Sequence, residues 1–75
     1  MVLNAKNPKN YNYIRTLREW RAYKKMDKKA VAKALCVSES TYTRMENAPH
    51  KISIGNAVVL SKLFGCDMKE INFFE

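Results

Sequence analysis

Apolar residues recur along this chain at three- and four-residue spacing, the period of helices that pack one face on a core. Ile14, Leu17 and Trp20 define the first inward stripe, on a helix expected to begin near 11–13 and to end near Lys24. No segment shows a convincing strand pattern. The pattern therefore predicts an all-helical fold.

Polar residues that can cap helix N-termini divide the rest of the chain. Pro49 cannot continue a helix, so it predicts a loop, and Gly65 is a natural helix stop. Asp67 with Glu70 fits a capping box. The expected helices run from Asp27 to about Leu35, from Ser38 to about Asn47, from Ser53 to Gly65 and over Met68–Phe73.

The expected helices each have apolar positions that predict their buried faces. With the first helix, they make an all-α, single five-helix domain over residues 11–75, preceded by a flexible basic arm over residues 1–10. The positions expected to face inward, or to be presented by the fifth helix, are Val31, Ala32, Leu35, Tyr42, Met45, Ile54, Ala57, Val58, Leu60, Phe64, Met68, Ile71 and Phe74.

The segment from Lys28 to Asn47 has the pattern of a helix-turn-helix. Two short helices can meet steeply only where small side chains let their backbones approach, and Ala32 and Cys36 supply these, while Val37 plugs the turn into the core. The second helix of the pair buries its apolar residues and exposes hydrogen-bonding ones. This is the geometry that holds a recognition helix out toward the major groove. The exposed residues are Glu39, Ser40, Thr41 and Arg44.

Five segments of the chain match a known family in their order and spacing. They are Leu17-Arg18-Glu19-Trp20-Arg21 through Met26-Asp27, Val31-Ala32-Lys33-Ala34-Leu35-Cys36-Val37-Ser38, Ser40-Thr41-Tyr42-Thr43-Arg44-Met45-Glu46-Asn47, Ser53-Ile54 through Leu60-Ser61-Lys62, and Gly65-Cys66-Asp67-Met68-Lys69-Glu70-Ile71. Through these segments, residues 14–74 resemble the Cro/CI-type (XRE-like) helix-turn-helix regulators of phages, plasmids and bacteria, the lambda-repressor-like DNA-binding fold. The resemblance implies five helices, with DNA read by the third.

The resemblance also assigns expected roles to single residues. Glu39, Ser40, Thr41 and Arg44 are expected in the groove, where Arg44 would contact guanine or a phosphate and Glu39 would accept a hydrogen bond from cytosine or only favour the helix dipole. Arg21 and Glu46 are expected to form a partly buried, structural ion pair. Phosphate contacts are expected from Lys28, Lys29, Thr43, Asn47 and Lys51.

Three positions depart from the family's pattern. Lys28 stands where the family usually has a glutamine that touches phosphate, and it can make that contact as a point charge. Cys36 replaces the glycine of the turn, so its backbone must avoid a left-handed conformation or tolerate the cost. Glu39 replaces a frequent glutamine, so no operator sequence transfers from a relative.

Charge agrees with a polyanionic partner. The net charge is +7, and residues 1–33 hold ten Lys or Arg against two acidic residues, which is +8, whereas residues 34–75 hold four against five, which is −1. Such a lopsided distribution attracts nucleic acid first and a membrane surface second. The alternative for the charge alone is a solvated face that binds nothing.

The 75-residue length leaves room for one domain and no large catalytic cleft. No nucleophile, base and orienting group can be assembled, so we expect no enzyme, no metal and no cofactor. Cys36 and Cys66 are expected to be small buried apolar residues in a reducing compartment. Without a membrane span or signal peptide, the sequence favours a cytoplasmic protein.

One small domain offers few base contacts, so the leading hypothesis is a transcriptional regulator of repressor type that binds a palindromic operator as a weak dimer. Ile71, Phe73 and Phe74 are the candidate dimer contacts, unless they fold back to close the core. The alternative function is a protein-interaction module, an antirepressor-like or antitoxin-like partner with the same fold. Glu39 and an exposed aromatic tail would suit that alternative.

Overall fold

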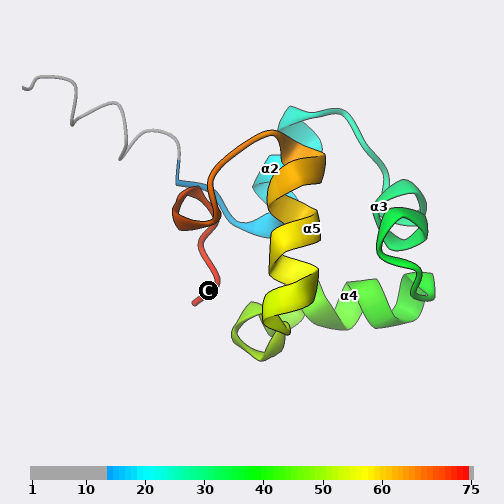
Figure 1. Cartoon of the computed structure of the whole chain (residues 1–75). Coiled ribbons are helices and arrows are strands. Elements are labelled where there is room, and N and C mark those ends of the chain that lie inside the picture. The colour runs from blue at the N-terminus through cyan, green and yellow to red at the C-terminus, as the bar shows by residue number, and fades with distance from the viewer. Residues whose placement is uncertain (1–13, 75) are drawn as a thin grey trace, which may run out of the picture.

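The computed structural model describes residues 14–74 and is all-helical over that range (Figure 1). The predicted N-terminal arm, residues 1–10, lies outside the described residues. Four α-helices and two 3-10 turns follow one another, with no strand among the described residues. They are α2 (Leu17–Tyr23), α3 (Lys28–Leu35), α4 (Glu39–Asn47), η1 (Pro49–Lys51), α5 (Ile54–Phe64) and η2 (Met68–Glu70).

Three predicted N-caps are confirmed. The side chains of Asp27, Ser38 and Ser53 each accept a hydrogen bond from the backbone N–H three residues on, at 2.8, 3.1 and 3.2 Å respectively. Each bond satisfies one of the amides that the first turn of a helix leaves unpaired. These caps place the starts of α3, α4 and α5 where the sequence predicts them.

The helix that carries Leu17 and Trp20 begins later than predicted, although the predicted start at 11–13 itself lies outside the described residues. Glu19 N–H donates to Thr16 Oγ1 at 3.2 Å, and Thr16 N–H donates back to Glu19 Oε1 at 2.9 Å, which is a capping box that starts α2 at Leu17. Ile14 therefore lies before the helix, and its side chain is exposed. Its assignment to the inward stripe is wrong, whereas Leu17 and Trp20 are buried as predicted.

The core lies where all four helices meet. Trp20 of α2 stacks on Phe64 of α5, with ring centroids 6.2 Å apart, and Tyr42 of α4 is fully buried in the same cluster. Ile54 was expected to be inward, but as the first residue of α5 it is 78% exposed. The remaining buried core residues are Leu17, Val31, Ala32, Leu35, Leu60 and Ile71.

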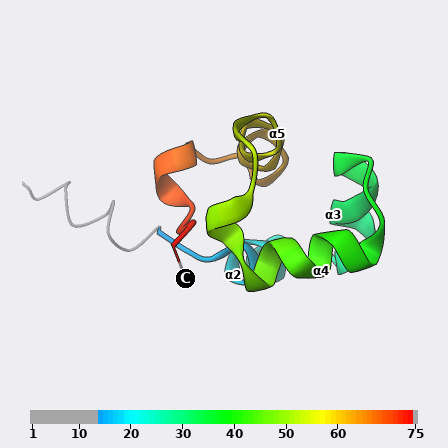
Figure 2. The ribbon, with the colours of Figure 1, turned by 90° about the horizontal axis from the view of Figure 1, so that it is seen from below.

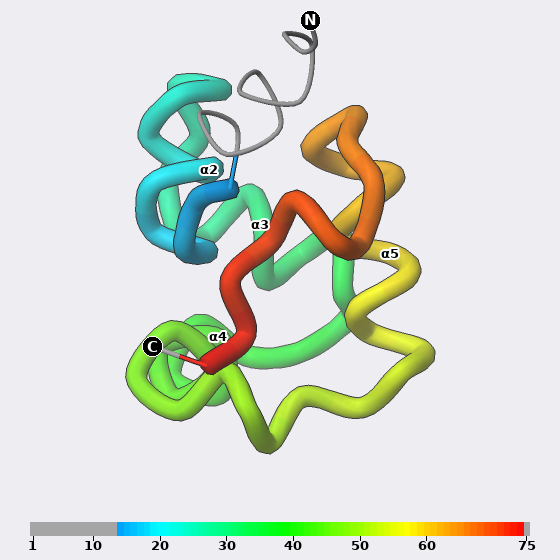
Figure 3. The backbone as a smooth tube through the Cα atoms, turned by 90° about the vertical axis from the view of Figure 1, so that its left-hand side faces the viewer, coloured from blue at the N-terminus to red at the C-terminus, as the bar shows by residue number. Residues whose placement is uncertain are grey.

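The predicted fifth helix over Met68–Phe73 is a single 3-10 turn, η2, followed by extended chain. Arg15 N–H donates to the Glu70 carbonyl at 3.0 Å, and Asn72 N–H donates to the Arg15 carbonyl at 2.8 Å. These backbone groups cannot serve a helix and this pairing at once, so the helix ends after one turn. The C-terminal segment, red in Figure 3, lies across one face of the helices.

Two of the helices end at a residue in the left-handed conformation. Gly65 ends α5 with φ 68°, as predicted, and Cys36 ends α3 with φ 60°. The Cys36 backbone thus accepts the left-handed conformation, and its side chain is exposed. The prediction that both cysteines are buried is wrong for Cys36, and Cys66 is only half-buried.

Candidate nucleic-acid interface

Helix α4 lies along one edge of the molecule, crossing below α5, which Figure 2 shows end-on. Tyr42 is fully buried and Met45 packs against the core, so these two side chains hold the helix from beneath. Its first turn remains on the surface: Glu39 and Ser40 are exposed, and Thr41 is half-buried. The structure therefore presents the polar end of α4 to the solvent.

Side chains at the start of α4 are bonded to one another. Ser38 Oγ donates to Thr41 Oγ1 at 2.9 Å and lies 3.2 Å from Ser40 Oγ. One turn later, Arg44 Nη2 donates to Thr41 Oγ1 at 3.3 Å. Three of the four predicted groove residues thus belong to one hydrogen-bonded group.

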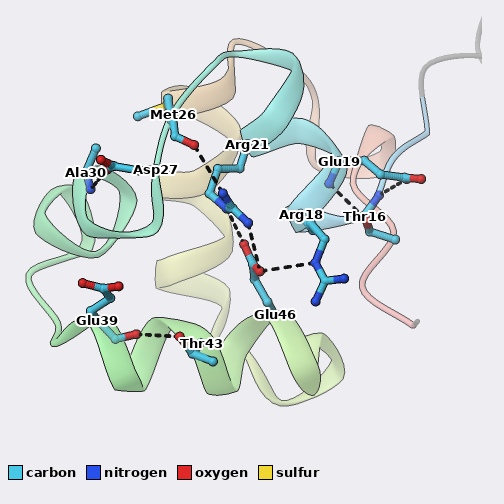
Figure 4. A network of polar contacts seen from close by, with 10 residues as sticks. All are labelled: Thr16, Arg18, Glu19, Arg21, Met26, Asp27, Ala30, Glu39, Thr43 and Glu46. Carbon is cyan, nitrogen blue, oxygen red and sulfur yellow. Dashed lines mark hydrogen bonds and ion pairs between the residues drawn. The ribbon is translucent and has the colours of Figure 1, made fainter.

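Glu39 stands apart from that group. Its backbone carbonyl accepts a hydrogen bond from Thr43 Oγ1 at 3.0 Å (Figure 4), while its carboxylate has no hydrogen bond or ion pair within residues 14–74. Since Thr43 uses its only hydrogen on this carbonyl, its hydroxyl can offer only lone pairs to a partner. A phosphate oxygen also offers only lone pairs, so Thr43 as it stands is poorly suited to the phosphate contact expected of it.

A groove of about 490 Å³ lies between α4, the η1 turn and the start of α5. Thr41, Arg44, Asn47 and Lys51 all line it, so two predicted groove residues and two predicted phosphate contacts share one depression. Ser53 and Asn56, from the start of α5, complete its polar lining. Its apolar lining consists of Met45, Ala48 and Ile52.

Lys28 and Lys29, the other two predicted phosphate contacts, open α3 and do not line this groove. Lys29 is exposed and Lys28 is half-buried. Lys28 is close enough to the Glu46 carboxylate for its charge to favour ionisation of that group. The two lysines therefore form a separate basic position next to the end of α2 and the start of α3.

The Arg21 and Glu46 side chains meet between α2 and the end of α4 (Figure 4). Arg21 Nε lies 2.7 Å from Glu46 Oε2 and Nη2 lies 3.4 Å from Oε1, which is a two-point contact. Arg21 Nη1 also donates to the Met26 carbonyl at 3.3 Å. The Arg21 side chain is 16% exposed and the Glu46 side chain 2%, so a largely buried ion pair connects α4 to α2.

The ion pair shifts the pKa of both members. The hydrogen bond to Glu46 raises the pKa of Arg21 in spite of its burial. Burial by itself would raise the pKa of Glu46, but hydrogen bonding and the positive charge of Arg21 outweigh it and lower that pKa. Both groups are therefore held in their charged forms.

Two polar residues of this region were not predicted as part of the site. Ser38 was assigned only a capping role, although the S-x-S-T spacing places its hydroxyl beside those of Ser40 and Thr41. Arg18 lies 3.8 Å from Glu46 Oε1, is 70% exposed, and lines a small pocket with Asn47. Its spacing of three from Arg21 is the signal that could have found it.

The three candidate dimer contacts have different surroundings. Ile71 is 4% exposed and belongs to the core, which leaves little of its side chain on the surface for a second copy. Phe73 is half-buried and packs against the core. Phe74 is 88% exposed, which leaves it as the one member of the three with a free side chain.

Among residues 14–74 there is no cluster of three or more His, Cys, Asp or Glu that could hold a metal ion. The same part of the chain contains no helix with the length and hydropathy of a membrane span.

Comparison with known proteins gives one family match. A family model described as Helix-turn-helix matches residues 17–71, which extend from the first residue of α2 to the residue after η2. No match was found among curated proteins or among solved structures. The matched segment includes both helices of the predicted motif and the exposed start of α4. The chain belongs to the helix-turn-helix family of Cro/CI (XRE) type, a family of DNA-binding regulators.

Proposed function

We propose that this protein is a transcriptional regulator of repressor type that places α4 in the major groove of a double-stranded operator. The observation that carries the proposal is the exposed, hydrogen-bonding first half of α4 on a helix held from beneath by Tyr42 and by the Arg21–Glu46 pair. Helices presented in this way read base edges with their N-terminal residues. Glu39, Ser40, Thr41 and Arg44 are the proposed readers.

Basic side chains on α4, after it and at the start of α3 support phosphate contacts on both sides of the proposed base-reading residues. Arg44 and Lys51 line the groove beside α4, and Lys28 and Lys29 open α3. Lysine and arginine contacts to phosphates fix the position of a protein on duplex DNA without reading its sequence. We include Asn47, which also lines the groove, among the proposed phosphate contacts. Thr43 joins them only if its hydroxyl releases the Glu39 carbonyl and donates to a phosphate instead.

The proposed operator is palindromic and bound by two copies. A single domain of this size makes few base contacts, whereas a two-fold dimer reads two half-sites about one helical turn apart, roughly 34 Å. Phe74, exposed at the end of the described chain, is the proposed contact between copies. A contact so small requires DNA to bring the two copies together.

The decisive experiment is selection of bound sequences from random duplex DNA, followed by footprinting of the selected site. A specific regulator yields one motif, arranged as two inverted half-sites, with protection centred on each half-site. Affinity for that duplex should fall steeply as the salt concentration rises, because binding releases counterions from the DNA. Recovery of random sequences would overturn the proposal.

A second candidate is a protein-interaction module of antirepressor or antitoxin kind. The Glu39 carboxylate, which has no ion pair within residues 14–74, favours it, since a negative charge at the start of α4 repels phosphates. The exposed Phe74 ring also suits an apolar protein contact. Salt separates the two candidates, because an apolar contact is not weakened by rising ionic strength as DNA binding is.

A further inference from the structure

The hydroxyl groups at the start of α4 have a defined hydrogen-bond direction. A hydroxyl has one hydrogen to donate and two lone pairs that accept. Ser38 Oγ accepts the backbone N–H of Thr41 at 3.1 Å and donates its own hydrogen to Thr41 Oγ1 at 2.9 Å. Ser38 therefore has no hydrogen left for any other partner.

This determines the role of Ser40. Its Oγ lies 3.2 Å from Ser38 Oγ, and one of the two must donate. Because the Ser38 hydrogen is already used, Ser40 is the donor in this pair. Both lone pairs of the exposed Ser40 hydroxyl then remain free, so Ser40 presents an acceptor to the solvent.

Thr41 has the opposite character. Its Oγ1 accepts from Ser38 Oγ and from Arg44 Nη2, at 2.9 and 3.3 Å, and these two bonds occupy both lone pairs. No acceptor within residues 14–74 takes the hydrogen of Thr41 itself. Thr41 therefore presents a donor, and it also holds the Arg44 guanidinium beside it.

We propose that these hydrogen bonds among Ser38, Ser40, Thr41 and Arg44, which we call the relay, determine which base edges α4 reads. Ser40 and Glu39 accept from an exocyclic amino group, and Thr41 and Arg44 donate to a guanine. In the major groove, cytosine N4 and adenine N6 are donors, while guanine O6 and N7 are acceptors. Thr41 acts partly as a positioning residue, because it orients Arg44 for the guanine. This role rests on the proposed function, and it adds which bases of the half-site donate to α4 and which accept from it.

Single-base variants of the selected half-site test the relay. Affinity would be measured on each duplex for the wild-type protein and for Thr41→Val, Ser40→Ala and Arg44→Ala, with one duplex carrying 7-deazaguanine, which lacks the N7 acceptor. Thr41→Val should weaken the preference for guanine on the order of tenfold, with little further loss when combined with Arg44→Ala. Ser40→Ala should instead weaken the preference for cytosine or adenine.

Thr43→Val is the matched control, since it makes the same change on the same helix without touching Arg44. It should leave the base preferences unaltered, with any loss of affinity equal on all duplexes. Thr41→Ser retains the hydroxyl and should restore the preference for guanine. The melting temperature of each variant shows whether it is folded.

The possible results separate two failures. If the wild-type protein prefers one motif but Thr41→Val lowers binding equally on every duplex, the relay is overturned and the proposed function stands. The same holds if Ser40→Ala changes the preference for guanine instead of the amino-bearing base. A wild-type protein with no sequence preference overturns the proposed function itself, and the relay with it.

Discussion

The guanidinium of Arg21 and the carboxylate of Glu46 form a two-point contact, 2.7 Å at its shorter bond, between α2 and the last turn of α4. The Glu46 side chain is almost completely buried, and Arg21 also bonds the carbonyl of Met26. This pair joins α4 to α2, the first described helix of the domain.

Removal of Arg21 should therefore destabilise the fold. Arg21→Ala leaves the Glu46 carboxylate buried without its main partner, and the expected loss is about 3–5 kcal/mol of the free energy of unfolding. Thermal and urea unfolding measure it. Arg18→Ala is the control, because Arg18 is exposed and 3.8 Å from Glu46, and should change stability by under about 1 kcal/mol. An unchanged melting temperature for Arg21→Ala, with DNA affinity lost, would place Arg21 on the DNA face.

The same pair predicts a dependence of stability on acid. The pKa of Glu46 is lower in the folded protein than the ordinary glutamate value of about 4.5, so the folded state favours the ionised form. Its contribution is present above pH 4.5 and is lost as the pH falls through the folded pKa. Unfolding by urea at a series of pH values should show this loss, and Glu46→Gln should reduce it. An equally steep acid loss in Glu46→Gln would assign the effect to other carboxylates.

Cys36 should be replaceable by glycine with a gain in stability. It holds φ 60°, a conformation that costs an L-residue about 1–2 kcal/mol, and its exposed side chain loses little burial on removal. Glycine also increases the conformational entropy of the unfolded chain, which offsets part of this gain. Cys36→Gly should therefore raise the free energy of unfolding by about 0.5–1 kcal/mol. Ala34→Gly, at an exposed position in the last turn of α3, should instead lose up to about 1 kcal/mol. Destabilisation by both changes would show that the Cys36 side chain contributes to the turn.

Arg44 is expected to supply the largest single share of base discrimination. Arg44→Ala should cost about 1–3 kcal/mol on the selected operator and relax the preference at one base pair in each half-site. Competition between the operator and its single-base variants measures this. A loss of equal size on every sequence would mean that Arg44 contacts phosphate only. Unchanged binding would remove α4 from the recognition role.

Phe74 provides the test of assembly. Its ring is exposed, so Phe74→Ser should leave the melting temperature unchanged while it lowers the cooperativity of binding to a full palindrome, with half-site affinity retained. Titration of half-site and full-site duplexes measures both. Ile71→Ala is the contrasting variant: it removes a core side chain and should cost about 2–5 kcal/mol in stability. Persistent cooperativity in Phe74→Ser would exclude this surface.

Local signals in the sequence determined the helix-turn-helix itself. A cap is a contact between neighbours in the chain, so Asp27, Ser38 and Ser53 could be identified without knowledge of the fold. The apolar spacing likewise determined that Val31 and Tyr42 face inward. The capping box at Thr16 is an equally local signal, but the apolar spacing of Ile14, Leu17 and Trp20 predicts a helix that continues through it.

Contacts distant in sequence decided the rest. The segment after Gly65 has the pattern of a helix, yet Arg15 pairs with its backbone and Trp20 Nε1 donates to the Glu70 carbonyl at 2.8 Å, so the chain is extended after one turn. That pairing buries Ile71 and leaves Phe74 exposed. Residues 15 and 70 are brought together only by the folded chain, and no local pattern encodes the bond between them. Only the tertiary structure could therefore decide which tail residues are free.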